Sequence, residues 1–206
     1  MKAAFSIEES LRFGWKKTKA HSALVFQSVL TIFGLQVLHA IVANTLEETF
    51  VGVLALCLVI IAEIFVGVGI TLISLRIARE ESVSYRDILP PLKVVWNYLV
   101  ASTLSGLLVL LGLFLFIIPG VYFAMRYSMV RFAVLDLSNK PGAILGSLKK
   151  SSEITNGVKW QILLFTVVII VINILGAVLF LVGLLITVPV TMIAYAHVYD
   201  KLLNRV

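Results

Sequence analysis

The strongest constraint on the fold is a long uncharged run in the middle of the chain. No charged side chain occurs between Trp96 and Ile118. At ~1.5 Å per residue, a helix of this run would be about 35 Å long, enough to cross a hydrocarbon layer of ~30 Å. The chain of 206 residues is 60% hydrophobic and 14% charged, whereas an average soluble domain is about 45–50% apolar and about 25% charged. The sequence therefore predicts an all-α, polytopic membrane protein.

Five further apolar runs raise the number of expected transmembrane helices to six, within one integral membrane domain over residues 1–206. Pro119 and Gly120 are expected to form the structural turn between the third and fourth spans, because proline cannot continue a helix and glycine accepts the angles of a reversal. The expected spans are about residues 22–43, 50–75, 96–118, 120–137, 160–179 and 181–199.

The distribution of basic residues predicts the orientation of these spans. Of the 17 Lys and Arg residues, all but Arg126 and Arg131 lie in the N-terminal segment, the second-to-third connection, the fourth-to-fifth connection or the C-terminal tail. The loop with Glu47 and Glu48 contains no base. Since cytoplasmic loops of membrane proteins are enriched in Lys and Arg, we expect both termini to be cytoplasmic.

The N-terminal residues 5–19 have the spacing of an amphipathic helix. Ile7, Leu11 and Trp15 fall on one face, and basic residues occupy another. A basic helix with a tryptophan on its apolar face can lie in the membrane interface. The alternative is a solvated cap that leads into the first span.

Residues 84–92 and 139–156 also resemble short surface helices. Ser84 and Asp87 have the spacing of a capping box, and Asn139 is suited to cap the later helix, which Asn156 and Gly157 would end. The sequence thus predicts two to three short cytoplasmic amphipathic helices. The residues expected to contact the membrane surface are Trp15, Lys16, Lys17, Lys149, Lys150 and Trp160.

Three ionic residues, Glu63, Arg126 and Arg131, lie deep inside expected spans, and Asp136 lies at the edge of one. An arginine at the centre of a membrane helix costs roughly 3 kcal/mol on insertion scales, so each requires an acid, water or a lipid phosphate nearby. One interpretation is a buried ion pair between Glu63 and an arginine. The other is a polar cavity that binds a phosphate or carboxylate, with Tyr127 and Asn173, and also Tyr122 and Tyr195, as further ligand contacts.

No pattern of catalytic or metal-ligating residues is evident. His21, His39 and His197 lack metal-ligand spacing, and no serine belongs to a nucleophile motif. We therefore expect no metal and no cofactor. The net charge is +6, but the bases flank apolar runs, so anionic membrane lipids are expected as partners and nucleic acid is not.

The run from Ile117 to Asp136, followed by AILGSLKKSSEITNGVKW and later VYDKL, resembles a bacterial membrane-domain family. This family occurs in some glycerophosphodiester phosphodiesterases and in stand-alone YciC-like inner-membrane proteins of unknown function. The resemblance covers the chain from about Arg86 onward and implies six spans, a bacterial inner-membrane location and a role in the cell envelope. It implies no enzyme mechanism, because the phosphodiesterase domain is absent. The positions that carry it are Pro119, Gly120, Arg126, Tyr127, Asp136, Ser151, Thr155, Gly157 and Trp160, although Val158 departs from the spacing.

Three hypotheses for function follow. The first is a non-enzymatic inner-membrane protein that binds or helps move an amphipathic anionic molecule such as a lipid. The second is a structural or assembly subunit, a homo-oligomer or the partner of another membrane protein, with Gly67, Gly69, Gly106 and Gly112 at close helix contacts. The third is a membrane enzyme that acts on lipid, for which no activated nucleophile is visible.

Overall fold

The computed structural model describes residues 4–46, 49–178 and 183–205, and every regular element within these ranges is a helix. The expected all-α class is therefore confirmed. The elements are α1 (Ile7–Ala20), α2 (Ser22–Leu46), α3 (Phe50–Ala78), the 3-10 helix η1 (Tyr85–Ile88), α4 (Leu92–Leu115), α5 (Ile117–Tyr127), α6 (Val130–Asp136), α7 (Ala143–Ile154), α8 (Lys159–Val178) and α9 (Leu184–Leu203).

Four of the described helices are long and apolar enough to cross a membrane. They are α2 over Ser22–Thr45, α3, α4 and α8. The expected fourth span, residues 120–137, is divided between α5 and α6, and the expected sixth span corresponds to α9, which contains Pro189. The connections around Glu47 and Glu48, and between α8 and α9, include residues outside the described ranges.

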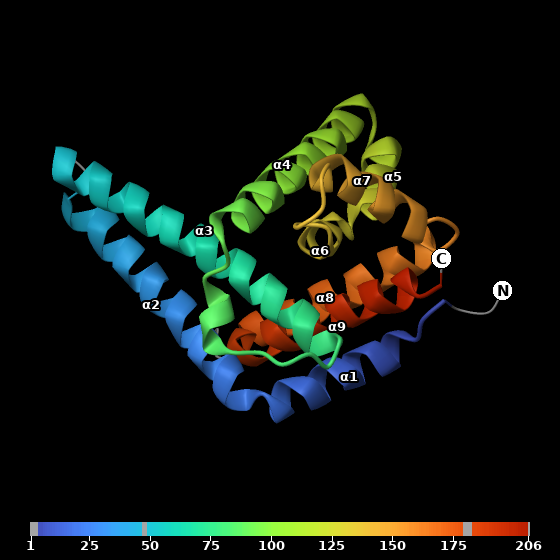
Figure 1. Cartoon of the computed structure of the whole chain (residues 1–206), viewed down its shortest axis with the longest axis horizontal. Helices are drawn as coiled ribbons and strands as arrows, with labels where there is room; N and C mark the ends of the chain where they lie inside the picture. The colour runs from blue at the N-terminus through green and yellow to red at the C-terminus, as the bar shows by residue number, and fades with distance from the viewer. Residues whose placement is uncertain (1–3, 47–48, 179–182, 206) are drawn as a thin grey trace.

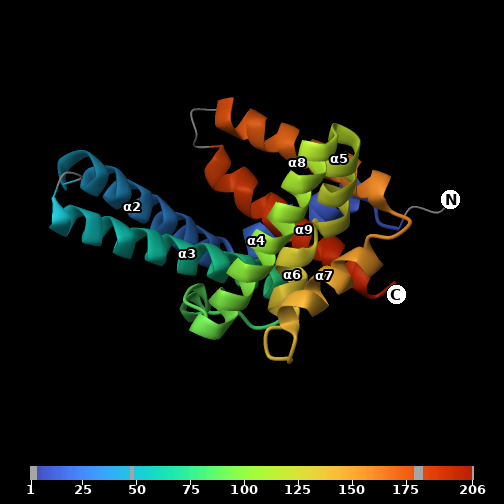
Figure 2. The ribbon, with the colours of Figure 1, turned by 90° about the horizontal axis from the view of Figure 1, so that it is seen from above.

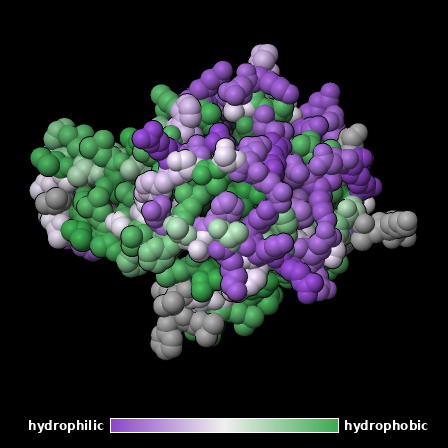
Figure 3. All heavy atoms as spheres, turned by 60° about the horizontal axis from the view of Figure 1, so that its bottom comes forward, coloured by the Kyte–Doolittle hydropathy of each residue, from purple (hydrophilic) through white to green (hydrophobic). Residues whose placement is uncertain are grey.

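The helices α2 and α3 form a hairpin that extends away from the rest of the molecule (Figures 1 and 2). Its distal part exposes large apolar side chains on α3, such as Phe50 at 79% and Leu58 at 68%. In the space-filling view, hydrophobic surface covers this hairpin at the left and part of the lower centre, and hydrophilic side chains cover much of the centre and right of the same face (Figure 3). Such an apolar arm suits a hydrocarbon environment, in which exposed leucine and phenylalanine carry no hydration cost.

The body of the molecule is packed around α9. Tyr199 and Phe165, from α9 and α8, are fully buried. Phe132 of α6 stacks on Tyr195 and Tyr199, with ring centroids 6.0 and 5.8 Å apart. These contacts fix α6 against α9 and thereby set the direction of the side chains on α6.

Ile7 and Leu11 of the expected apolar face of α1 pack against the core, but the closest contact of α1 with α9 is made by its small residues. Ser10, Gly14 and Thr18 are buried, and a methyl group at Gly14 would collide with the carbonyl oxygen of Val190. Trp15, assigned to the apolar face, is instead exposed. The physical reason is that small side chains at four-residue spacing let two helix backbones approach closely.

The turn between α4 and α5 is formed by Phe116, and the expectation for Pro119 and Gly120 is wrong. Phe116 has an extended backbone (φ −165°, ψ 156°), whereas both other residues belong to the beginning of α5. Proline is tolerated in a first helical turn, where its missing N–H has no helical partner. Gly120 packs directly against Gly112 and Leu113 of α4, so it serves close packing between the two helices.

The tip of the hairpin formed by α4 and α5 lies beside the chain ends, which differs from the expected topology. Ile118 shares a groove with Lys159, Trp160 and Arg205. The distribution of bases predicts instead that Ile118 lies on the side of the membrane opposite to the other three residues. The reason lies in the preceding connection, which runs back along α3. The backbone of Ile88 packs onto Gly69, where any side chain would collide with the Ile88 carbonyl. Helix α4 therefore starts alongside the middle of α3.

The other two surface segments agree only in part with expectation. The capping box of Ser84 and Asp87 is present, but it caps the 3-10 helix Tyr85–Ile88. Helix α7 begins after Gly142 and not at Asn139, because Gly142 adopts a left-handed backbone (φ 72°) that glycine accepts readily.

Candidate functional site: a polar cavity around Arg131

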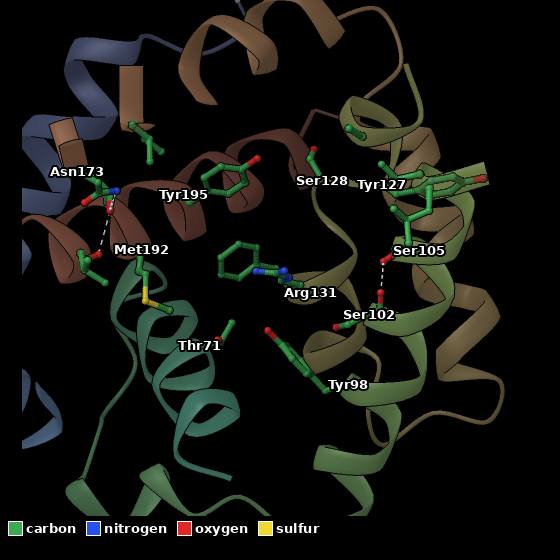
Figure 4. A pocket seen from close by; sticks show the side chains of 18 residues that line it. Thr71, Tyr98, Ser102, Ser105, Tyr127, Ser128, Arg131, Asn173, Met192 and Tyr195 are labelled. Atoms are coloured by element: carbon green, nitrogen blue, oxygen red, sulfur yellow. Dashed lines mark hydrogen bonds between the residues drawn. The ribbon is translucent and has the colours of Figure 1, made fainter. Parts of the chain in front are cut away.

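A cavity of about 700 Å³ lies between α3, α4, the α5–α6 segment, α8 and α9 (Figure 4). More than half of its lining residues carry a polar side-chain group, although all of the surrounding elements consist mostly of hydrophobic residues. The polar lining residues are Thr71, Tyr98, Ser102, Ser105, Tyr127, Ser128, Arg131, Asn173, Thr191 and Tyr195.

Arg131 is the cationic residue of the cavity lining. On α6 it is exposed to the cavity, while its neighbours Val130 and Phe132 are buried in the core. Within residues 4–46, 49–178 and 183–205, its guanidinium forms no hydrogen bond or ion pair. In Figure 4 it lies between Tyr195 and Tyr98. Its five N–H donors are therefore directed into the cavity without a protein acceptor.

Two further polar atoms of residues that line this cavity are buried without a hydrogen-bond partner among the described residues. They are Oγ of Ser102 and Oδ1 of Asn173. The amide nitrogen of Asn173 donates to Oγ1 of Thr191 at 3.3 Å, which orients the free oxygen. A buried polar atom without a partner costs about 1–3 kcal/mol, so this cavity is built to receive polar atoms from water or a ligand.

The break between α5 and α6 is what turns Arg131 toward the cavity. The chain leaves α5 at Ser128 and re-enters a helix at Val130. A helix end leaves carbonyl groups unsatisfied, and here the hydroxyl of Ser151 on α7 donates to the Arg126 carbonyl at 2.9 Å. The hydroxyl of Thr155, at the end of α7, lies 3.2 Å from the same carbonyl and 2.8 Å from that of Ser151. The polar residues of α7 thus stabilise the interruption.

Glu63 does not pair with either intramembrane arginine. Its carboxylate accepts from Nε2 of Gln36 at 3.2 Å and contacts Nδ1 of His39 at 3.1 Å. Both partners belong to α2, so these contacts join α2 to α3 within the projecting hairpin. The expected ion pair with Arg126 or Arg131 is wrong because that hairpin diverges from α5 and α6 (Figure 2).

Arg126 does not line the cavity either. Its Nε donates to the hydroxyl of Ser152 at 2.8 Å, and its guanidinium carbon lies 5.7 Å from the ring centroid of Tyr127. Tyr122 also lies elsewhere, and its hydroxyl accepts from Lys159 at 3.0 Å. Of the expected ligand residues, the structure therefore brings together Arg131, Tyr127 and Asn173, with Tyr195.

A second ionic site was not expected from the sequence. Arg79, at the end of α3, donates to Asp136 at 2.8 Å and to Asp200 at 3.1 Å. The hydroxyl of Tyr199 donates to Asp136 at 3.1 Å. Burial alone would lower the pKa of Arg79, but the hydrogen bonds and charges of both carboxylates outweigh it and raise that pKa. Asp136 therefore pairs with Arg79, which is distant in the sequence, and not with the nearby bases Arg131 or Lys140.

The residues expected at a membrane surface are mostly solvent-facing. Trp15 and Trp160 are 48% and 75% exposed, and Lys16 and Lys149 are exposed while Lys150 is half-buried. Lys17 departs from this role because its ammonium group pairs with Glu80 at 2.6 Å.

The polar face of α4 was missed, although the sequence contains its signal. Tyr98, Ser102 and Ser105 recur at i, i+4 and i+7 within an apolar helix, which places them on one side. Of the glycines expected at helix contacts, Gly69 and Gly112 lie at such contacts, whereas Gly67 and Gly106 face open space. Among the described residues, no group of three or more His, Cys, Asp or Glu is placed to hold a metal ion.

Comparison of this chain with known protein families, with curated proteins and with solved structures gives no match. The resemblance to the phosphodiesterase-associated membrane domains consequently stays a prediction from the residues named above.

Proposed function

We propose that this protein is a non-enzymatic, integral protein of the bacterial inner membrane that binds an anionic lipid through Arg131. The observation that carries the proposal is a guanidinium directed into a polar cavity that no carboxylate from the described residues lines. An arginine at membrane depth is costly unless it is paired, and a lipid phosphate is the counter-charge that a bilayer supplies.

The chemistry of the cavity fits a phosphate group. A guanidinium can donate two parallel hydrogen bonds to phosphate oxygens. Ser102 and Tyr98 add hydroxyl donors from α4, and the free amide oxygen of Asn173 can accept from a hydroxyl of a polar head group.

The same lining supports binding over hydrolysis. Among the lining residues in the described part of the chain there is no His, Asp or Glu. A serine hydroxyl there has no neighbouring general base to activate it.

Lipid retention in native mass spectrometry tests this proposal. The full chain is extracted in mild detergent, mixed with dioleoyl phosphatidylglycerol and stripped by collisional activation. We expect the wild type and Arg131→Lys to retain the lipid, with Lys weaker because it lacks the bidentate donor pair. Arg131→Gln should lose about tenfold in affinity, the equivalent of ~1.4 kcal/mol.

Arg86→Gln is the matched control, since Arg86 is exposed on the short 3-10 helix. Phosphatidylcholine, whose head group carries no net charge, is the control lipid. Equal retention of phosphatidylglycerol by Arg131→Gln and by the wild type would refute the proposed site.

We also propose that both termini are cytoplasmic, and that the expected six-span topology is modified at α4 and α5. The position of Ile118 beside Lys159 and Arg205 supports a hairpin whose tip returns to the cytoplasmic side. Cysteine labelling in intact cells, in a Cys57→Ala background, tests this: Phe116→Cys should react from the same side as Arg205→Cys. Labelling of Phe116→Cys from the opposite side would restore six full spans.

A further inference from the structure

A second cavity, of about 240 Å³, adjoins the polar one on the other side of the contact between α3 and α9. It lies between α2, α3 and α9, and its walls are almost entirely apolar, for example Val29, Ile70 and Leu184. Val188 and Met192 of α9 line both cavities. The polar cavity and this apolar cavity, called the groove below, therefore share a wall of two side chains.

The two cavities are lined by neighbouring but different residues of α3. Thr71 lines the polar cavity, and its neighbour Ile70 lines the apolar one. Ile73 and Ser74, one turn further along, are buried at the apolar cavity. The change from polar to apolar lining thus takes place across a single helix width.

We infer that the two cavities together bind one lipid molecule, with its anionic head group at Arg131 and one hydrocarbon chain in the groove between α2, α3 and α9. This inference rests on the proposed function and names its ligand class: an anionic lipid with a long acyl chain, as opposed to a free soluble anion. The charge of Arg131 selects the head group, and continuity across Val188 and Met192 places the chain.

The wall between the cavities is suited to such a ligand. Methionine is unbranched and adapts its shape to an irregular neighbour, so Met192 can move aside along a bound chain. Val188 lies one turn before it on α9, next to Pro189. Proline removes one helical hydrogen bond, which loosens α9 at the level where the chain would pass.

A photoreactive lipid tests this placement. The probe is phosphatidylglycerol with a diazirine on one acyl chain, added to the purified full chain in detergent, with the cross-linked peptides mapped after illumination. We expect labelling of residues 25–36 of α2 and 184–193 of α9, and competition by dioleoyl phosphatidylglycerol. Dihexanoyl phosphatidylglycerol, whose chains are short, should compete poorly.

Coupling between the two cavities separates a bound lipid from the surrounding lipid. Lipids around α2 should label its exposed face whether or not Arg131 is present. Arg131→Gln should therefore reduce labelling of the groove and leave labelling of exposed positions such as Leu30 unchanged.

Filling the groove provides the second variant. Val29→Trp places a large ring inside it, and we expect about tenfold weaker groove labelling, equivalent to ~1.4 kcal/mol, the lower range of overpacking costs. Leu30→Trp, one residue away and 58% exposed, is the matched control. If Val29→Trp fails to fold, Val29→Phe is the milder substitution.

The possible failures can be told apart. If the wild type retains no phosphatidylglycerol in native mass spectrometry, the proposed function itself fails. If retention depends on Arg131 but groove labelling is unaffected by both Arg131→Gln and Val29→Trp, the lipid is bound by its head group only, and the inference about the chain is overturned. Equal competition by dihexanoyl phosphatidylglycerol would overturn it as well.

Discussion

Arg79 and Arg131 both belong to the helical body that packs around α9, yet their surroundings are opposite. Arg79 forms ion pairs with Asp136 and Asp200, from two different helices. Arg131, only five residues before Asp136, faces a cavity and meets no carboxylate among the described residues. One arginine therefore joins helices through ion pairs, and the other has its guanidinium free to bind a ligand.

This difference shows that the position of a charge in an apolar segment is insufficient to assign its role. A paired arginine contributes to the folded structure. An arginine directed into a cavity costs stability until a ligand neutralises it, a pattern common at functional sites. Replacement of Arg79 and of Arg131 by an uncharged residue should therefore change the stability of the protein differently.

The largest expected effect is at the paired arginine. Arg79→Ala leaves two partly buried carboxylates without a counter-charge, and we expect it to lower the free energy of unfolding by about 2–3 kcal/mol, below the full cost for a completely buried pair because solvent reaches the site. Thermal unfolding in detergent measures this. Arg86→Ala, at an exposed position, should change stability by less than ~0.5 kcal/mol. Equal effects of the two substitutions would contradict the structural role of Arg79.

The next effect concerns the helix break that directs Arg131. In Ser151→Ala/Thr155→Ala, the Arg126 carbonyl loses the hydroxyl of Ser151 and the more distant hydroxyl of Thr155, and the cost should be about 1–3 kcal/mol. Ser151→Ala alone should account for most of this cost and Thr155→Ala alone for less, since the Thr155 hydroxyl has its shorter hydrogen bond to the Ser151 carbonyl at 2.8 Å. Phosphatidylglycerol retention should fall as well, because the support of α6 is weakened. A double variant as stable as the wild type would show that α7 does not hold the break.

The cavity arginine should respond in the opposite direction. Without added lipid, Arg131→Leu removes an unpaired cation, so we expect unchanged stability or a gain of about 0.5–1 kcal/mol. Chemical unfolding of delipidated protein measures it, with Arg131→Lys as the control that keeps the charge. A loss comparable to that of Arg79→Ala would mean that Arg131 has a structural partner.

The smallest effect is expected from two exposed ion pairs, Lys201–Glu9 and Lys17–Glu80. A hydrogen bond from Lys201, with its charge, lowers the pKa of Glu9 from 4.5, and Lys17 does the same for Glu80. Because these folded-state pKa values are lowered, their contribution to stability is present above pH 4.5 and is lost as the pH falls through them. Lys201→Gln should therefore reduce the loss of melting temperature on acidification, whereas Lys149→Gln, at an exposed position, should not. An identical acid profile in both variants would exclude the Glu9 pair.

Much of the fold follows from local sequence patterns. The bounds of α2, α3 and α8 agree with the apolar runs, because the backbone in an apolar environment must satisfy its hydrogen bonds within each helix. The capping box at Ser84 was also predictable, since it depends on two residues three positions apart.

What could not be predicted depends on contacts between distant segments. The position of α4 depends on the packing of Ile88 onto Gly69, and the position of α1 depends on the packing of Gly14 against α9. A glycine that permits close approach looks the same in sequence as one that faces open space, such as Gly34. Three-dimensional packing decides between them.

The candidate site was predictable as a set of residue types and only in part as a constellation. Arg131, Tyr127 and Asn173 were expected and do line one cavity. Glu63 was assigned to it because its depth along α3 matched that of the arginine, but depth does not determine which helices are neighbours. The partners of Glu63 on α2 exclude it from the site.

The most direct test of the central claim is stabilisation by lipid. A ligand present at ~100 times its dissociation constant stabilises the folded state by about 2.7 kcal/mol. We predict that dioleoyl phosphatidylglycerol raises the melting temperature of the wild type and of Arg86→Gln, and leaves that of Arg131→Gln unchanged. An equal rise in all three proteins would show that the lipid binds elsewhere and would contradict the assignment of Arg131 as its receptor.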